Sequence, residues 1–405
     1  MALSQVLELT KKIEFVAKAV EATWADGVGS GNHVVRAKAE DYMQKFNDMI
    51  LERIDLATAH LLRFADEHVN DRNELQVEEI SGGLSLGLWS SYNDIRPIRK
   101  SVIFEKVGVQ LDIPKQVLQH DARFIHRVIR CPLETMSYRA YHPDANKPGF
   151  VGQVEKYVVG DVIIVDILRP PAGALNIRAK KWVLRDHSSL SLNIQRCPYP
   201  SAVPCKCFVK VPEDVFMSEE VTMALWNPET QQWVQDGSIT EFQYSEANRQ
   251  AQFYTTAVGI FALVKDRVAD LPFKFWGLGP VRAKGVPTEE DDPSTNKPSE
   301  GCARLTVQNQ RHTVVIEIVG SKCRLVEPTV RQVEDLLGKY MTPGILLHRL
   351  LRKGLNVFPT VLDAPRCTLL RKPVKVGSVL VPPARAACLH HTCTVTLVYN
   401  DNSCM

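Results

Sequence analysis

The segment VTMALWNPETQQWVQDG, residues 221–237, places two short apolar runs on either side of a Pro-Glu-Thr-Gln turn. Both runs contain β-branched and aromatic residues, which predicts a hairpin between a strand at 221–226 and a strand around 232–235. Trp226 and Trp233 then lie near the two sides of this hairpin. Such tryptophans form either a packed pair or a platform for a sugar or a base. We expect packing, with both rings more than half buried.

The same pattern continues on both sides of this hairpin. Segments such as KYVVGDVIIVDILRPP (156–171) and GIFALVKD (259–266) are rich in β-branched and aromatic residues and are bounded by turn residues. Short segments of this kind at close intervals are typical of antiparallel sheets. We therefore predict an antiparallel β-sandwich from about residue 82 to about residue 268.

The N-terminal region has a helical period instead. DYMQKFNDMILERIDLATAHLLRFADEH (41–68) places apolar residues at spacings of three and four, which predicts one long amphipathic helix. SQVLELTKKIEFVAKAVEATW (4–24) predicts a shorter helix, and DGVGSGN (26–32) a flexible break between the two. The helices either pack on each other or on the next domain, or supply half of a coiled coil to a partner chain.

The C-terminal part begins with a change of composition. RAKGVPTEEDDPSTNKPSEG (282–301) is rich in Pro, Ser, Thr and acidic residues, which indicates a linker or a long exposed loop. A small sheet should follow, and then two helices, TVRQVEDLLGKY (329–340) and TPGILLHRLLRKGLNVFP (342–359). The second helix has Thr342 where an N-cap belongs, Pro343 at the first helical position, and Gly354 at the C-terminal cap.

The predicted fold class is mainly β with α, in five parts. They are a helical N-terminal region (1–78), an antiparallel β-sandwich region (79–281), an acidic linker or loop (282–301), a small α+β domain (302–365), and a basic Cys/Pro-rich tail (366–405). The tail differs from the rest in composition, so we expect it to be poorly packed and dispensable.

Charge and composition limit the partners. The chain has 49 basic and 46 acidic side chains, so it lacks a general attraction for nucleic acid or membranes, and we expect neither as a partner. Glu8, Lys11 and Lys12 interrupt the N-terminus where a signal peptide needs an apolar core, and no later segment reaches a membrane-spanning length. We expect a soluble intracellular protein, with most of the 10 cysteines as buried or free thiols.

The sequence contains no strong motif for catalysis, nucleotide binding or metal binding. The sequence has no Gly-rich phosphate loop, no G-x-S-x-G elbow and no H-E-x-x-H. We weighed four candidate clusters and expect a structural or solvated role for each: Cys205 with Cys207, the run CLHHTC at 388–393, the acidic residues 289–292, and His120 with Asp121 and His126. We therefore predict no enzyme, no catalytic residue, no cofactor and no metal.

Several co-linear segments resemble one family. They are LGLWSSYNDIRPIRKSVIFEKVGVQLDIPKQVL (86–118), GDVIIVDILRPP (160–171), the hairpin region from Ala224, LPFKFWGLGP (271–280), ARLTVQNQRHTVVIEIVGSKCRLVE (303–327) and MTPGILLHRLLRKGLNVFP (341–359). In order, they resemble the axonemal dynein intermediate chain 7 family, also called the cancer susceptibility candidate 1 family. The likeness runs from about residue 40 to about residue 360.

The resemblance implies a non-catalytic accessory subunit of an inner-arm axonemal dynein complex. Its implied partners are axonemal dynein heavy, intermediate and light chains and the tubulin of the microtubule. Its implied location is the axoneme of a cilium or flagellum, with the cytoplasm before assembly. The chain is truncated or divergent at both ends of the family pattern, because it lacks the long charged N-terminal segment and the likeness stops after about Asp363.

One basic cluster is a candidate microtubule contact. The turn NDIRPIRK (93–100) presents Arg96, Arg99 and Lys100 beside a strand, and Lys106 follows across the next turn. The alternative is a solvated loop whose charges keep a sheet edge from pairing. At the level of function, the alternative to the dynein subunit is a stand-alone β-sandwich that binds carbohydrate or RNA.

Overall fold

The computed structural model of the chain describes most of residues 33–131 and 156–357 and scattered positions from Glu8 to Thr23. Its gaps within those two ranges are 64, 72–73, 82, 92–98, 121–123, 170–174, 179–180, 185–194, 231, 272 and 281–301. The CLHHTC run and the basic tail lie outside the described residues. In the described parts, no helix combines the length and the apolar character that a membrane crossing requires.

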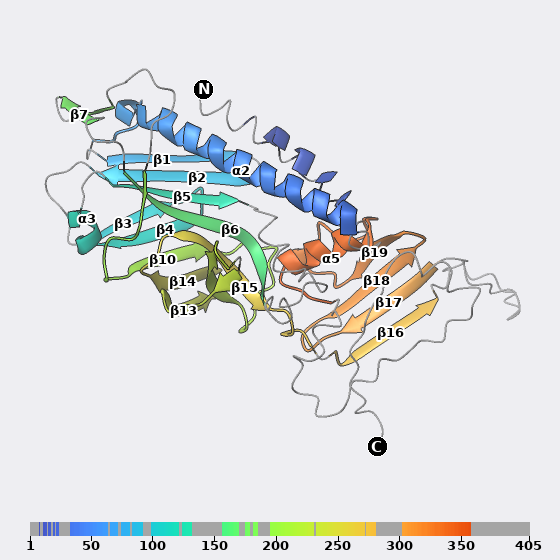
Figure 1. Cartoon of the computed structure of the whole chain (residues 1–405). Helices are drawn as coiled ribbons and strands as arrows, with labels where there is room; N and C mark the ends of the chain where they lie inside the picture. Colours follow the sequence, from blue (N-terminus) through green and yellow to red (C-terminus); the bar gives the residue numbers. More distant parts are fainter. Residues whose placement is uncertain are drawn as a thin grey trace, which may run out of the picture.

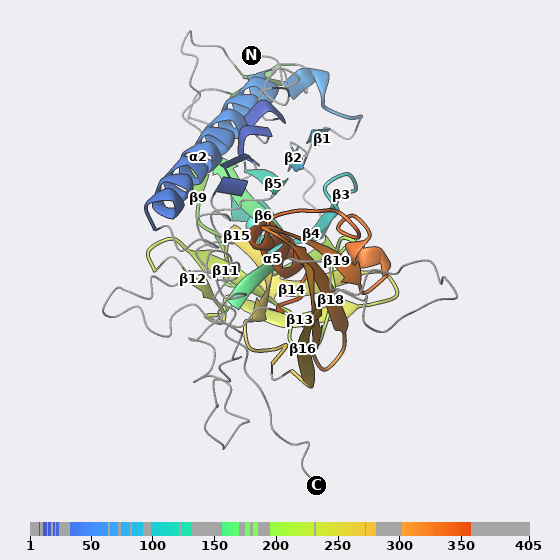
Figure 2. The same ribbon diagram turned by 90° about the vertical axis from the view of Figure 1, so that its right-hand side faces the viewer.

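Three layers make up the larger part of the molecule: helix α2, an eight-stranded sheet and a five-stranded sheet (Figures 1 and 2). The eight-stranded sheet has the order β1-β2-β5-β6-β15-β11-β12, with β9 paired to β6. Its strands are β1 (Glu74–Ser81), β2 (Leu84–Ser91), β5 (Ile125–Cys131), β6 (Lys156–Arg169), β9 (Gln195–Cys197), β11 (Thr222–Asn227), β12 (Gln232–Val234) and β15 (Gly259–Asp266).

The five-stranded sheet has the order β13-β14-β10-β4-β3 and faces the first sheet. Its strands are β3 (Arg99–Phe104), β4 (Val109–Pro114), β10 (Cys205–Lys210), β13 (Ile239–Ser245) and β14 (Gln250–Thr255). The short helix α3 (Lys115–His120) follows β4, and β7 (Leu175–Arg178) pairs with β8 (Lys181–Leu184) apart from both sheets. All pairings in the two large sheets are antiparallel, so the predicted sandwich is confirmed.

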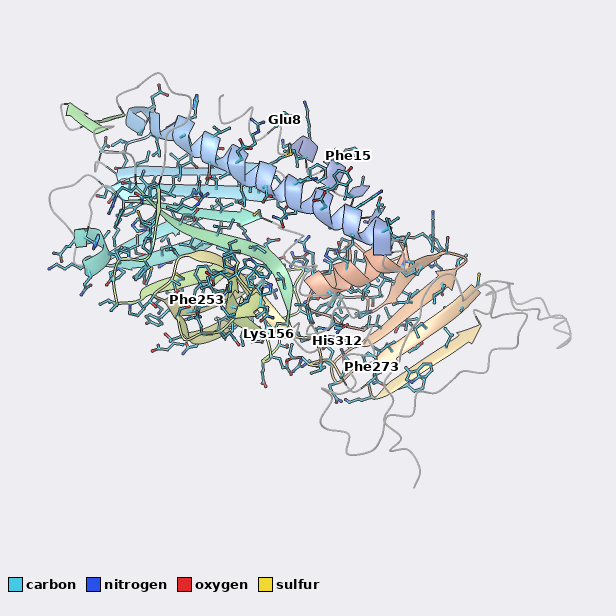
Figure 3. All side chains as sticks on the ribbon, in the orientation of Figure 1. Glu8, Phe15, Lys156, Phe253, Phe273 and His312 are labelled. Carbon is cyan, nitrogen blue, oxygen red and sulfur yellow. The ribbon has the colours of Figure 1, made fainter. Side chains whose placement is uncertain are left out.

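Two hydrophobic clusters lie on opposite faces of the eight-stranded sheet. One lies between the sheets and contains Phe104, Leu111, Phe253 and Phe261, of which Phe253 is labelled in Figure 3. The other lies under α2 and contains Ile54 and similar residues. Since both faces of β6 are covered, its sequence is nearly continuously apolar rather than alternating.

Helix α2 (His33–Arg63) confirms the predicted long helix and starts ahead of the expected Asp41. Its inner stripe, which includes Met43, Ile50 and Ile54, is buried. The described N-terminal residues 8–23 are also helical, and Ile13 joins the same cluster as Ile50. The helices therefore pack on the sandwich as one of the two alternatives predicted. A coiled coil with a partner chain stays a prediction.

The tryptophan hairpin is also confirmed. Trp226 on β11 pairs directly with Trp233 on β12, and their ring centroids are 5.2 Å apart in an edge-to-face arrangement. The two side chains are only 9% and 8% exposed. Both belong to the cluster on the α2 side of the sheet, so their function is packing.

A second, smaller unit, here called the C-terminal unit, contains a four-stranded antiparallel sheet with the order β16-β17-β18-β19. Its elements are β16 (Phe275–Pro280), β17 (Cys302–Gln308), β18 (Thr313–Val319), β19 (Lys322–Glu327), the 3-10 turn η2 (Arg331–Val333) and helix α5 (Pro343–Arg352). Strand β16 precedes the acidic segment 282–301 and pairs with β17 after it. The predicted small sheet therefore includes one strand that the sequence pattern placed with the sandwich.

The prediction of a helix at 329–340 is wrong. Only η2 forms there, and the chain then follows the edge of β19, where the Gly338 N–H donates to the Leu325 carbonyl at 2.9 Å. Leu336 is buried against the sheet, so tertiary packing and edge bonds satisfy this segment in place of helical bonds. The next helix begins at Pro343 as expected, although the Thr342 hydroxyl makes no capping bond.

Candidate functional site

Lys100 and Lys106 of the predicted basic cluster lie at an edge where the two sheets of the sandwich meet. The Lys100 ammonium on β3 is 2.7 Å from a Glu74 carboxylate oxygen on β1, and it lies 6.0 Å from the Trp89 ring centroid. The backbone N–H of Lys106 donates to the Glu78 carboxylate at 2.7 Å. Between them, the Gln76 amide donates to the Ile103 carbonyl at 2.8 Å.

The three contacts come from every second residue of β1, so the side chains involved point to the same face of the strand, toward the other sheet. They join β1 to β3 and to the turn that follows β3. Lys100 is 23% and Glu74 13% exposed, so this ion pair is partly shielded from water. Two of the four predicted contact residues therefore hold the sandwich closed at this edge. The side chain of Arg99 and the whole of Arg96 lie outside the described residues.

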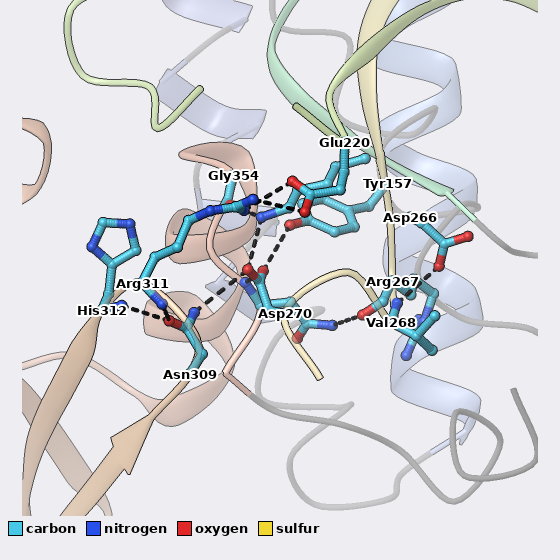
Figure 4. A network of polar contacts seen from close by, with 12 residues as sticks. Tyr157, Glu220, Asp266, Arg267, Val268, Asp270, Asn309, Arg311, His312 and Gly354 are labelled. Atoms are coloured by element: carbon cyan, nitrogen blue, oxygen red, sulfur yellow. Dashed lines mark hydrogen bonds and ion pairs between the residues drawn. The ribbon is translucent and has the colours of Figure 1, made fainter. Parts of the chain in front are cut away.

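A buried ionic network joins the sandwich to the C-terminal unit (Figure 4). The Lys265 ammonium, on β15, is 2.8 Å from an Asp270 carboxylate oxygen and donates to the Gly354 carbonyl at 3.0 Å. The other Asp270 oxygen accepts the Asn356 N–H at 3.0 Å. Lys265 and Asp270 are 3% and 4% exposed, so water screens this pair very little.

Further contacts surround the network at the same junction. Arg311 forms two parallel bonds to Glu220, at 2.8 and 2.7 Å. Phe216, from the sandwich, donates its N–H to the Lys353 carbonyl at 2.7 Å and belongs to the hydrophobic cluster of the C-terminal unit. Phe273 and His312, labelled in Figure 3, lie where the two units meet.

Gly354 shows how closely the units approach. Its φ is +88°, and a Cβ atom there would lie 2.7 Å from the Phe216 carbonyl oxygen. Only glycine combines this backbone conformation with that distance. The predicted C-terminal cap of α5 thus also serves the junction between the units.

A buried arginine fixes α2 to the sheet. Arg127, on β5, is 1% exposed and donates to Asp166 through two nitrogens, at 2.9 and 2.6 Å. Its third nitrogen donates to Asp55 at 2.7 Å and to the Thr58 hydroxyl at 3.1 Å, both on α2. Arg196 adds two bonds of 2.8 Å to Asp55 from the solvent side.

The other candidates from the sequence have packing positions. Cys205 and Cys207 are buried free thiols on β10, and hydrogen bonding with Cys205 together with burial raises the pKa of Cys207 well above its ordinary value. His120 is exposed at the end of α3, and Asp121 lies outside the described residues. Within the described ranges, no three His, Cys, Asp or Glu side chains gather as metal ligands would.

His126 is buried against Trp89, with ring centroids 5.6 Å apart. Burial lowers its pKa to about 4, from 6.5. Between these values the unfolded chain binds a proton that the folded chain excludes, so stability should fall as the pH drops from about 6.5 to about 4, by up to about 1.4 kcal/mol per pH unit. Denaturation at several pH values should show this slope, and His126→Phe should remove it. An unchanged slope in the variant would contradict the assignment.

The sequence pattern missed the two buried networks. Lys265 and Arg127 lie within apolar strand sequences, GIFALVKD and IHRVIR, where a charge interrupts an otherwise buried run. A charged residue at an expected core position indicates a buried partner. The sequence pattern does not identify the partner itself: Asp166 lies on another strand, and Asp270 lies in the turn that follows β15.

Comparison with known proteins gives several relatives and no match to a protein-family model. Dynein axonemal intermediate chain 7 homolog of Ciona intestinalis is 32% identical over 152 residues, which is 37% of this chain and 18% of the relative. Dynein axonemal intermediate chain 7 of Danio rerio is 25% identical over 222 residues, 49% of this chain and 27% of the relative. The Bos taurus protein of that name is 25% identical over 343 residues, 80% of this chain and 43% of the relative.

The chain spans less than half the length of each of these relatives. The likeness covers the sandwich and the C-terminal unit together, since the Bos taurus match extends over 80% of the chain. All six curated matches carry the same protein name. The resemblance expected from the sequence is therefore confirmed, and over most of its length the chain is similar to the dynein axonemal intermediate chain 7 family.

Proposed function

We propose that the chain is a non-catalytic accessory subunit of an inner-arm axonemal dynein complex. In this role it scaffolds axonemal dynein heavy, intermediate and light chains and associates with the microtubule in cilia or flagella. The similarity to proteins named dynein axonemal intermediate chain 7 supports the dynein part of this proposal. The cytoplasm would hold the chain before assembly.

The observation that carries the scaffold role is the buried junction between the two units. Lys265, Asp270 and Gly354 hold the C-terminal unit against the sandwich through charges that are almost completely buried. Arg127 attaches α2 to the same sheet in the same way. A scaffold requires its binding faces to keep a fixed relative position, and such buried ionic contacts provide directional, specific attachment.

Microtubule association would depend on Arg96 and Arg99. Lys100 and Lys106 are engaged with Glu74 and Glu78, so a contact with acidic tubulin would draw mainly on the two arginines. Such a contact should weaken as the Debye length falls from about 10 Å at 0.1 M salt toward about 3 Å at 1 M.

We expect the double change Arg96→Glu with Arg99→Glu to weaken co-sedimentation with microtubules about tenfold at low salt. Lys100 stays unchanged in this variant, because its reversal would place a second carboxylate beside Glu74 and disturb the sandwich edge. Lys106→Gln is a suitable control, since its backbone bond to Glu78 does not need the side chain. Pelleting equal to that of the wild type would exclude this cluster as the contact.

The location of a tagged copy tests the proposal as a whole. In ciliated cells the full chain should distribute along the axoneme. The alternative function, a stand-alone sandwich for carbohydrate or RNA, predicts a diffuse or granular distribution instead. The burial of Trp226 and Trp233 weakens that alternative, because it removes the aromatic platform that such a module would use.

A further inference from the structure

The two edges of the four-stranded sheet differ. Beyond β19, the Cys323 N–H donates to the Met341 carbonyl at 2.8 Å, and Met341 returns a bond of 2.9 Å. Gly338 adds a bond to Leu325 at 2.9 Å, so the chain itself covers this edge. In the described part of the chain, no segment pairs with β16 on the side away from β17. Figure 1 shows β16 at that outer edge.

Strand β16 has few of the features that protect an edge, namely Lys274 just before it and Pro280 at its end. Phe275 is 52% and Leu278 44% exposed, and they point to opposite faces of the sheet. Between its ends the strand has no charged residue, and a Cβ atom at Gly279 would meet nothing within 4 Å. An exposed apolar edge strand is a ready template for pairing with another extended chain.

The adjoining face has an excess of positive charge. Arg304 on β17 and Arg324 on β19 both bind the one carboxylate of Glu317. One carboxylate balances one guanidinium, so these three side chains together carry one net positive charge. Arg304 is 48% exposed and pairs directly with Gly279, so no side chain separates it from the open edge.

We propose that β16 binds an extended segment of a partner protein by strand addition, and that this segment alternates acidic and apolar residues. A residue placed opposite Gly279 points to the same face as Arg304, two strand spacings or about 10 Å away. A Glu there and the long Arg304 side chain together span that distance. The neighbouring apolar residue points to the other face, beside Leu278, and extends the core that contains Leu305.

A second copy of the chain fits this edge less well. In an antiparallel pair centred on Gly277, Gly279 would face Phe275 of the second copy, so the second copy would bring no acidic residue opposite Arg304. The inference rests on the proposed function, because an assembly subunit requires docking edges. The test below uses only the purified chain, so its failure would leave the axonemal location unaffected.

The probe is a fluorescein-labelled peptide, SVEVEVEVS, titrated against the full chain and followed by fluorescence anisotropy. The control peptide has Lys in place of each Glu. We expect binding of the acidic peptide only, and a threefold to tenfold loss of affinity, roughly, in Arg304→Gln. Lys322→Gln is the matched control, because it removes a positive charge from β19, at the covered end of the sheet, and leaves Arg304, Arg324 and Glu317 in place. The affinity of this control variant for the acidic peptide should stay within about twofold of the wild-type affinity.

Four results would overturn the proposal. Equal loss in both variants would show a general effect on the sheet, and equal binding of the two peptides would show that charge does not matter. If the free chain sediments as a dimer that Leu278→Lys converts to a monomer, a second copy occupies the edge. If the peptide binds only after residues 289–292 are changed to Ser, the chain's own acidic run is the occupant. Thermal unfolding of each variant confirms that it is folded.

Discussion

Asp270→Asn is expected to lower the free energy of unfolding by about 3–5 kcal/mol, because it leaves the Lys265 ammonium buried without a counter-charge. Asn retains the shape of Asp, so the change removes charge rather than volume. Asp270 also accepts the backbone N–H of Asn356. The loss of stability should therefore extend to the segment after α5. Denaturant unfolding of the purified chain would measure the effect.

The control for this prediction is Glu220→Gln at the surface of the same junction. Glu220 and Arg311 are each 38% exposed, so the loss of their pair should cost less than about 1 kcal/mol. The double change Lys265→Met with Asp270→Asn should recover part of the stability, since it removes both buried charges and keeps an acceptor for the Asn356 N–H. A small effect of Asp270→Asn, similar to that of Glu220→Gln, would contradict the importance of the junction.

Arg127→Met should have a similar effect on the attachment of α2, about 3–5 kcal/mol. The change leaves Asp166, which is 9% exposed, with only the longer ion pair to the half-exposed Arg196 at 3.7 Å, and it removes the bonds to Asp55 and Thr58. Because those two residues lie on α2, hydrogen exchange should accelerate first in that helix. Hydrogen-exchange mass spectrometry combined with denaturant unfolding would measure both effects.

Arg196→Met is the matched control, because Arg196 binds the same Asp55 but is 53% exposed. Its loss should cost less than about 1 kcal/mol and leave the exchange of α2 nearly unchanged. Uniform acceleration of exchange across both sheets in Arg127→Met would contradict a specific role in holding the helix.

The large features of the fold could be predicted from the period of the sequence. The apolar stripe of α2, the sandwich and the paired tryptophans all depend on local alternation or on spacings of three and four, which a single sequence shows. Residues 329–340 could not be predicted, because their helical spacing competes with the edge of β19, which forms only in the folded chain. The strand β16 was placed with the wrong neighbours for a similar reason, since its partner β17 follows a long acidic segment.

The residues of the candidate site also divide into those that a local sequence pattern reveals and those that only the folded chain brings together. The sequence identified the charges of Lys100 and Lys106 but not their partners, which lie on a strand that pairs in the other sheet. Lys265 and Arg127 are visible as charges in apolar strands, whereas the pairing with Asp270, in the turn after β15, and with Asp166, on another strand, forms only in the folded chain. Resemblance to a family supplied the proposed function, which no motif in the chain would have indicated.

The most direct test of the account is affinity purification of the tagged full chain from axonemes, followed by crosslinking mass spectrometry. The proposal predicts that axonemal dynein heavy, intermediate and light chains co-purify, with crosslinks from lysines of both the sandwich and the C-terminal unit. An untagged axoneme preparation is the control. Recovery of the chain without any dynein subunit, or with carbohydrate- or RNA-binding proteins in their place, would contradict the account.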